Sequence, residues 1–440
     1  LNALAQRGWQ RPICEVLPAV TCTAQATMLT GKLPREHGIV GNGWLYRDTM
    51  EVRFWQQSNR LLGADPLYVT ARRRAAERGQ SFRVAQLFWG FNQGAAVDVS
   101  VTPKPHYGAD GNKAFDILAY PDGLAERLKQ KLGAFPFQTF WGPMAGLPAS
   151  EWIGRCAAEV LTAPDGPPDL TLVYVPHLDY DTQRLGPADC DWGKLAGELD
   201  RACAPLLDAA ERVGARIWVV NEYAHVQVER PVYLNRALRQ AGLLISRPGP
   251  FGEQLDTFAS RALAVCNHQL AHVYVSDSRD VPMVEELIAA LSGVDRVYVG
   301  DQRSEIGLDH PRAGELVVLA QPNAWFAYPF WLEDRSAPDY ARTVDIHRKP
   351  GYDPCELLFD PKLWWPMGRA MRRLVAKKLG FRTLFDVVQL DATLVRGSHG
   401  LCVADPQDRP VLIGTESPPA QSEFNQTDVH DLVLGALGLE

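Results

Sequence analysis

Residues 171–221 read TLVYVPHLDYDTQRLGPADCDWGKLAGELDRACAPLLDAAERVGARIWVVN, and this stretch decides the fold class. Its two ends, residues 171–176 and 216–221, are short apolar runs rich in β-branched and aromatic residues, which is typical of strands buried in a parallel sheet. Between them, residues 192–213 carry apolar side chains at three- and four-residue spacing, which predicts a helix, with a kink or break at Pro205. Strand, helix and strand in this order form a crossover unit, so we expect an open α/β sheet.

A polar cluster follows each of the two predicted strands. The clusters are residues 179–184 and residues 222–225. Ligands of open α/β sheets bind beyond the carboxyl ends of the strands. We therefore expect a functional site where these two clusters meet.

The remainder of the chain predicts a core with a large insertion. Residues 229–384 contain further strand candidates at 272–276, 296–299 and 315–320, followed by a stretch rich in aromatic residues and proline. We interpret this block as an insertion or cap over a core formed by residues 1–228 and 385–440. Residues 427–439 predict a closing helix that begins at a Thr-Asp pair.

Composition limits the classes of partner. The 440 residues are 46% hydrophobic and 22% charged, and the net charge of -7 argues against a nucleic acid polymer as the partner. Eight scattered cysteines without a Cys-x-x-Cys pair predict reduced thiols in a cytoplasmic protein. We find no apolar run near the ~20 residues of a membrane helix, and we expect no membrane partner. The sequence begins at Leu1 without Met, so a targeting segment upstream stays open.

Residues 18–44, PAVTCTAQATMLTGKLPREHGIVGNGW, form the first chemical motif. A hydroxyl at a helix N-terminus, such as that of Thr21, lies in a positive local field beside free N–H groups, which suits an incoming phosphate. A threonine hydroxyl is a weak nucleophile and needs a metal or a base to activate it. The alternative is that Thr21 only caps the helix.

In this motif Thr21, Thr30-Gly31, Pro34-Arg35-Glu36-His37-Gly38 and Asn42 occur in the order found in nucleotide pyrophosphatases. The chain therefore resembles the type I phosphodiesterase / nucleotide pyrophosphatase family of the alkaline phosphatase superfamily. The resemblance implies an alkaline phosphatase-like α/β fold with a central, mostly parallel sheet flanked by helices, and an inserted cap. It also implies that Thr21 is the nucleophile and that Asn42 donates a hydrogen bond to the phosphoryl oxygen.

The family has Asp-x-x-x-His-x-x-Gly-Pro after a strand, with both Asp and His as metal ligands. Here Asp179 and Gly186-Pro187 match this pattern, and Gln183 stands in the place of the His. Side chains four residues apart share one face of a helix and can hold one ion. An amide oxygen suits Mg²⁺, Mn²⁺ or Ca²⁺ better than Zn²⁺. The alternative is a solvated loop at the end of the strand.

Two further motifs resemble the family's remaining ligands. Residues 221–225, NEYAH, stand where the family has an Asp-His ligand pair, so Glu222 keeps a carboxylate and Tyr223 replaces the His, with His225 two residues later as a substitute. The alternative is a polar strand end without a ligand role. His399 in the sequence GSHG matches the family's last His ligand. The resemblance implies one more metal-binding Asp, in a strand before Leu1 and outside this sequence.

Three residues are candidates for substrate binding. Cys22 follows the nucleophile where a nucleotide phosphodiesterase often has an aromatic side chain for stacking on a base, and its small size argues against a nucleotide preference. Residues 345–354 could bring His347 and Arg348 over the active site, because a guanidinium grips phosphate oxygens. The alternative is a polar surface turn. We interpret the histidines that lack partners at ligand spacing as structural or solvated: His106, His268, His272, His310 and His430.

The functional hypothesis is a metal-dependent phosphodiesterase, acting on a small-molecule phosphate ester through a phospho-threonine intermediate. Zn²⁺ is expected by resemblance, with Mn²⁺ or Mg²⁺ as alternatives because of Gln183 and Tyr223. One rival hypothesis is a phosphate-ligand binding protein whose metal site has degenerated. Another is an enzyme rewired to one metal or to a harder metal, with His225, His177 or His347 recruited. Metal content separates the three.

Overall fold

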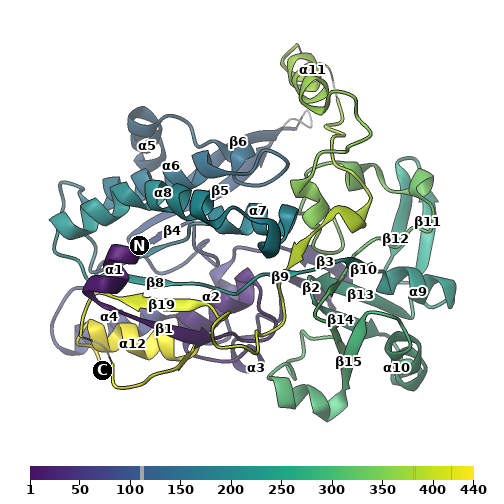
Figure 1. The fold of residues 1–440 in the computed structure, drawn as a ribbon, viewed down its shortest axis with the longest axis horizontal. Coiled ribbons are helices and arrows are strands. Elements are labelled where there is room, and N and C mark those ends of the chain that lie inside the picture. The colour runs from purple at the N-terminus through teal and green to yellow at the C-terminus, as the bar shows by residue number, and fades with distance from the viewer. Residues whose placement is uncertain (110–112, 380, 382, 418) are drawn as a thin grey trace.

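The computed structural model describes residues 1–109, 113–379, 381, 383–417 and 419–440. One four-stranded sheet of this part of the chain has the order β6-β5-β4-β7, in which β4 pairs in parallel with β5 and β7 and only β6 runs antiparallel. Helices α5, α6 and α8 lie beside this sheet (Figure 1). Its elements are β4 (Val84–Leu87), β5 (Val99–Tyr107), β6 (Lys113–Tyr120), α5 (Leu124–Leu132), α6 (Leu147–Leu161), β7 (Leu170–Val173) and α8 (Trp192–Arg212).

A second four-stranded sheet has the order β20-β1-β19-β8, and α1, α2 and α12 lie around it (Figure 1). Strand β19 runs antiparallel to both β1 and β8, and β20 pairs in parallel with β1. The elements are α1 (Asn2–Arg7), β1 (Trp9–Cys14), α2 (Thr21–Thr30), β8 (Trp218–Val220), β19 (Val411–Gly414), β20 (Phe424–Asn425) and α12 (Asp428–Ala436). The predicted closing helix is therefore confirmed as α12.

Both strands of the predicted crossover unit are present, as β7 and β8, and α8 lies between them along the chain. They are not neighbours, because β7 is the last strand of the first sheet and β8 is the last strand of the second. Each strand takes its partner from elsewhere: β7 pairs with β4, and β8 pairs with β19 from the C-terminal region. The crossover thus leads from one sheet to the next. The mixed α/β class is confirmed.

Helix α8 continues through Pro205, so the predicted break does not occur. It begins after Asp191, whose side chain accepts a hydrogen bond from the Lys194 amide. The helix packs closely on α6, since a Cβ placed at Gly154 would lie 1.9 Å from the Ala202 carbonyl oxygen. Buried residues lie on both sides of the proline. Burial of this face outweighs the roughly 3 kcal/mol that a proline costs inside a helix.

A third four-stranded sheet, β13-β14-β16-β15, lies in the region expected to be an insertion. All its strand pairs are antiparallel, and every residue of β13 and β14 is buried. Its hydrophobic core also includes Cys22 and Ala26 of α2 and Trp44 of β2 (Gly43–Tyr46), so the core crosses the predicted boundary. The division into two units stays a prediction. The elements are α9 (Leu234–Gln240), β11 (Ile245–Gly249), β12 (Gly252–Asp256), β13 (Ala262–Asn267), β14 (Leu270–Val275), α10 (Val281–Ala289), β15 (Val294–Val299) and β16 (Leu316–Ala320).

The remaining elements connect these layers. Helix α11 stands away from the rest of the molecule at the top of Figure 1. No described helix has the length and apolar character that crossing a bilayer requires. The connecting elements are α3 (Pro34–His37), β2 (Gly43–Tyr46), β3 (Glu51–Phe54), α4 (Leu67–Glu77), α7 (His177–Leu185), β9 (Val226–Gln227), β10 (Arg230–Val232), β17 (Ala324–Phe326), α11 (Pro366–Lys378) and β18 (Gly397–Ser398).

A buried ion network fixes residues 345–356 to the body of the protein. The Lys349 ammonium is 1% exposed and lies 2.7 Å from Asp353 Oδ2 and 2.8 Å from Glu356 Oε1. Burial alone would lower the pKa of Lys349, but the two carboxylates raise it above its ordinary value. Glu356 also accepts hydrogen bonds from the Asp345 amide and, at 2.6 Å, from Trp141 Nε1. The network therefore sets the position of Tyr352, which lies between the paired residues.

We expect Lys349→Met to lower the free energy of unfolding by about 3–5 kcal/mol, because it leaves two buried carboxylates without their counter-ion. The measurement is urea denaturation followed by fluorescence. Lys362→Met is the matched control, since Lys362 is exposed. Equal unfolding midpoints for the two variants would show that the network contributes no stability.

Candidate active site

Helix α7 carries the central carboxylate of the site. Asp179 lies in its first turn, and Gln183 lies one turn later on the same face. Gln183 Nε2 donates to Asp179 Oδ2 at 2.8 Å, and Gln183 Oε1 accepts a hydrogen bond from the Tyr352 hydroxyl at 3.1 Å. The structure therefore places the predicted ligand Gln183 beside Asp179, where its amide orients the carboxylate.

The short pairing of β9 with β18 brings two histidines together. This antiparallel register pairs Ser398 with Val226, so the next residues outward, His399 and His225, are neighbours on the same side. A Cβ at Gly397 would lie 1.8 Å from the Thr182 carbonyl oxygen. Only glycine allows β18 to approach α7 this closely. The pairing thus delivers both imidazoles to the first turn of α7.

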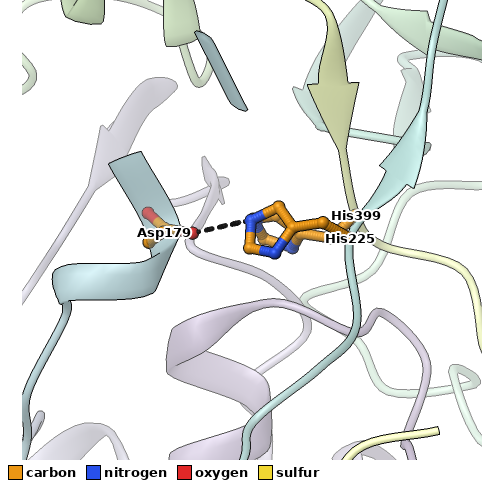
Figure 2. A group of neighbouring side chains, drawn as sticks. All are labelled: Asp179, His225 and His399. Carbon is orange, nitrogen blue, oxygen red and sulfur yellow. Dashed lines mark hydrogen bonds and ion pairs between the residues drawn. The ribbon is translucent and has the colours of Figure 1, made fainter. Parts of the chain in front are cut away.

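Asp179, His225 and His399 form a cluster whose ligand atoms all lie within 4.8 Å of one another. Asp179 Oδ1 is 3.0 Å from His225 Nε2 and 4.0 Å from His399 Nε2 (Figure 2). The carbonyl oxygen of Ala19 lies 2.7 Å from His399 Nδ1. A carbonyl can only accept, so His399 carries its proton on Nδ1 and keeps the lone pair of Nε2 for a ligand.

The charge states of this cluster suit a divalent cation. Burial and the neighbouring histidines hold the pKa of His399 well below its ordinary value, so its ring is neutral. Burial alone would raise the pKa of Asp179, but the hydrogen bond and the electrostatic effect of His225, with a hydrogen bond from Gln183, hold it below its ordinary value. One carboxylate and two imidazoles are ligands that Zn²⁺ and similar ions take in proteins. The donor set therefore fits one ion.

Thr21 is the first residue of α2, and its hydroxyl is tied to this cluster. Thr21 Oγ1 lies 2.9 Å from the Tyr223 hydroxyl, which donates to Asp179 Oδ1 at 3.2 Å. A phenol has one proton, so Thr21 must be the donor in its bond to Tyr223. Burial and the charge of Asp179 raise the pKa of Tyr223 well above its ordinary value, which keeps the phenol neutral. Its ring stacks on His399 at 3.7 Å with an interplanar angle of 4°.

Glu222 is half-buried beside Thr21. Gln25 donates a hydrogen bond to its carboxyl group, and Gln25 in turn accepts one from the Gly90 amide. Burial raises the pKa of Glu222 to about 8, although the hydrogen bond from Gln25 opposes this shift. A protonated carboxyl group is a poor metal ligand. In this structure Glu222 and Tyr223 thus form hydrogen bonds at the place where the family has its second pair of ligands.

Asn42 lies against the start of α2. Its side-chain Oδ1 accepts a hydrogen bond from the Cys22 backbone amide at 2.9 Å, and its backbone amide donates to Asn267 Oδ1 at 2.8 Å. The remaining group, Nδ2, is buried and has no partner among the described residues. A buried donor without a partner costs about 1–3 kcal/mol, and a phosphoryl oxygen would satisfy it.

The structure does not bring the three candidate substrate-binding residues into the cluster. Cys22 is buried with its side chain in the hydrophobic core, where burial raises its pKa. His347 and Arg348 are exposed, and Arg348 pairs with Asp345 at 3.3 Å. From the same segment, Tyr352 reaches the site through Gln183.

Sequence reasoning interpreted His268 as structural or solvated, but it lies against the site. Its ring centroid is 3.7 Å from that of His399 and 3.9 Å from that of Tyr352. Its φ of 63° is uncommon for a residue other than glycine, and its Nε2 is buried with no partner among the described residues. The available signal was the polar triplet 267–269, which stands between two largely apolar runs, 262–266 and 270–275.

The fold and this site define an alkaline phosphatase-like α/β protein. The chain belongs to the type I phosphodiesterase / nucleotide pyrophosphatase family, whose model matches residues 1–353. Comparison with curated proteins finds no match.

Solved structures confirm the fold. Phosphonoacetate hydrolase from Sinorhizobium meliloti 1021, in complex with phosphonoformate, is 15% identical with a TM-score of 0.58, and the match covers 99% of this chain and 89% of that one. Murine ectonucleotide pyrophosphatase/phosphodiesterase 5, as an inactive variant in complex with AMP, is 14% identical with a TM-score of 0.57, covering 100% and 89%. The human counterpart is 13% identical with a TM-score of 0.53, covering 98% and 88%.

Proposed function

We propose that this protein is a metal-dependent hydrolase of small phosphodiesters or related phosphoryl compounds, with Thr21 as the nucleophile. The observation that carries the proposal is the chain of hydrogen bonds from Thr21 through Tyr223 to Asp179, directly beside His225 and His399. A nucleophile held by a neighbour that is itself oriented by a third group is the arrangement that nucleophilic catalysis needs.

Asp179, His225 and His399 would hold the ion, with Zn²⁺ expected from the family and from the two imidazoles. A divalent ion at such a site supplies Lewis acidity and lowers the pKa of a bound hydroxyl group. This donor set favours a site rewired to one ion, with His225 in the role that the family gives to the residue at position 183.

The chain's own residues position and hold the reacting groups. The N-terminus of α2 and Asn42 Nδ2 bind the phosphoryl oxygens. The Tyr223 hydroxyl accepts a hydrogen bond from the Thr21 hydroxyl. This bond orients the lone pairs of Thr21 Oγ1 for attack on phosphorus. The P–Oγ1 bond forms as the bond to the leaving group breaks, and the proton of the Thr21 hydroxyl goes to the departing alkoxide, which gives phospho-threonine and releases an alcohol. Water then cleaves the P–Oγ1 bond and returns a proton to Thr21.

We expect Asn42→Ala to lower kcat by about 10²–10³-fold, because it removes a hydrogen-bond donor to the developing charge. The measurement is steady-state hydrolysis of bis-p-nitrophenyl phosphate. Asn42→Asp is the matched variant, since its carboxylate still accepts from the Cys22 amide but donates nothing. Equal losses in both variants support the donor role. Full activity of Asn42→Asp would assign to Asn42 only the capping of α2.

The substrate class comes from chemistry and from the fold neighbours. Two of those neighbours are complexes with phosphonoformate and with AMP, and the net charge of -7 disfavours a nucleic acid polymer. We therefore propose a small phosphate or phosphonate compound. The test is turnover of bis-p-nitrophenyl phosphate that disappears after chelation and returns with one divalent ion.

A second candidate function is phosphate-ligand binding without turnover. The carboxyl group of Glu222 and the phenol of Tyr223 favour it, because both are engaged in hydrogen bonds at the place where the family has a ligand pair. A protein of this kind would bind inorganic phosphate but would hold no ion and turn over no ester.

A further inference from the structure

Residues 361–385 differ in charge from the rest of the protein. This segment carries seven lysines and arginines and no aspartate or glutamate, although acidic residues outnumber basic ones by 52 to 45 in the whole chain. A concentrated positive segment on a protein of net charge -7 makes a local electrostatic surface. The positive charge of this segment therefore indicates an anionic partner, although the protein as a whole is negatively charged.

The same segment exposes large apolar side chains. Trp364 is 97% exposed and Trp365 is 66% exposed, directly before α11. Met367, Met371 and Val375 are also exposed, and their spacing of four residues puts them in one stripe along the helix. Contiguous exposed apolar surface of this kind marks an interaction site.

Helix α11 is held to the body at its base and stands clear of it elsewhere (Figure 1). Arg369 and Arg373 both pair with Asp386, the latter at 3.1 Å. Arg372 is exposed on the same helix. The ion pairs therefore tether the helix while its apolar stripe and further positive charge remain on the surface.

We propose that residues 361–379 of this segment form a peripheral membrane-binding surface, with α11 lying in the headgroup region of an anionic bilayer. Tryptophan pairs favour the interface between lipid and water, the apolar stripe enters the acyl boundary, and arginine attracts anionic headgroups. A helix of 13 residues lies on a bilayer and does not cross it. A second copy of the chain would bring the same positive charge to this surface, and a nucleic acid would leave the apolar stripe in water. This function is independent of the hydrolase site.

The test is flotation of the full-length protein with vesicles of phosphatidylcholine and phosphatidylserine, beside vesicles of phosphatidylcholine alone. We expect binding to the anionic vesicles that falls as salt increases. The double variant Trp364→Ser/Trp365→Ser should bind at least about tenfold more weakly, and Arg372→Glu about fivefold or more. Phe258→Ser is the matched control, because Phe258 is 79% exposed in the turn between β12 and β13 and its replacement should leave binding unchanged.

Four results would overturn the proposal. They are no flotation of the wild type, equal binding of the double variant and the wild type, a dimer in light scattering that the double variant dissociates, and binding to a homopolymeric RNA without binding to lipid. The variants keep turnover of a soluble ester in every case, because none of these residues contacts the hydrolase site. A loss of turnover and a loss of lipid binding are thereby separate outcomes.

Discussion

Thr21→Ala should lose hydrolysis of bis-p-nitrophenyl phosphate by at least about 10³-fold, since removal of a nucleophile that acts within a unit abolishes most of the rate enhancement. The hydroxyl of Thr21, at the start of α2, is hydrogen-bonded into the Asp179 cluster through Tyr223. Thr21→Ser keeps an oxygen at this place. It should therefore retain activity within about tenfold, because the chain of hydrogen bonds is preserved.

The measurement for this prediction is kcat together with a chemical quench and mass spectrometry of the peptide that contains residue 21. The wild type should carry phosphate on Thr21 in the quenched reaction, and Thr21→Ala should carry none. Both variants should melt within a few degrees of the wild type. Turnover of Thr21→Ala at the wild-type rate would rule out Thr21 as the nucleophile, whatever the metal content.

His399→Ala should weaken binding of the divalent ion by more than about 100-fold and should abolish turnover. Loss of a residue that only hydrogen-bonds to a metal ligand costs about 10–100-fold in metal affinity, and loss of the ligand itself should cost more. The reason lies in the lone pair of His399 Nε2, which the Ala19 carbonyl leaves free by accepting from Nδ1. Asp179→Asn should have a similar effect, since it removes the negative charge that His225 and His399 face.

The readout for the ligand variants is competition with a metallochromic chelator, followed by activity after addition of excess ion. His106→Ala is the matched control because His106 is exposed and lies outside the cluster. It should bind the ion and turn over substrate as the wild type does. Unchanged metal affinity in His399→Ala would show that the ion is held elsewhere.

Local pattern predicts the elements of this fold better than it predicts how they pair. The apolar runs at 171–176 and 216–221 became β7 and β8, because their β-branched and aromatic residues favour a strand locally, although both strands are only half-buried. Their placement in two different sheets depends on β4 and on the distant β19, which no local pattern reveals. Continuation of α8 through Pro205 depends similarly on close packing against Gly154 of α6.

The site shows the same division between local and long-range information. Asp179 and Gln183 are one helical turn apart, so their contact follows from spacing. The neighbourhood of His225 and His399 needs the pairing of β9 with β18, which are far apart in the chain. His268 reaches the cluster from a hairpin of the third sheet and could not be selected by spacing. Tyr352, and neither His347 nor Arg348, faces the site because the Lys349 network fixes that segment.

The central claim is that Asp179, His225 and His399 hold an ion that supports attack by Thr21. The most direct test is the metal content of the purified full-length protein, measured together with turnover of bis-p-nitrophenyl phosphate for the wild type and for His399→Ala. One divalent ion per wild-type chain, with turnover that His399→Ala loses together with the ion, is the result that we predict. No bound ion and no turnover under Zn²⁺, Mn²⁺ or Mg²⁺ would contradict it and would favour a phosphate-binding protein.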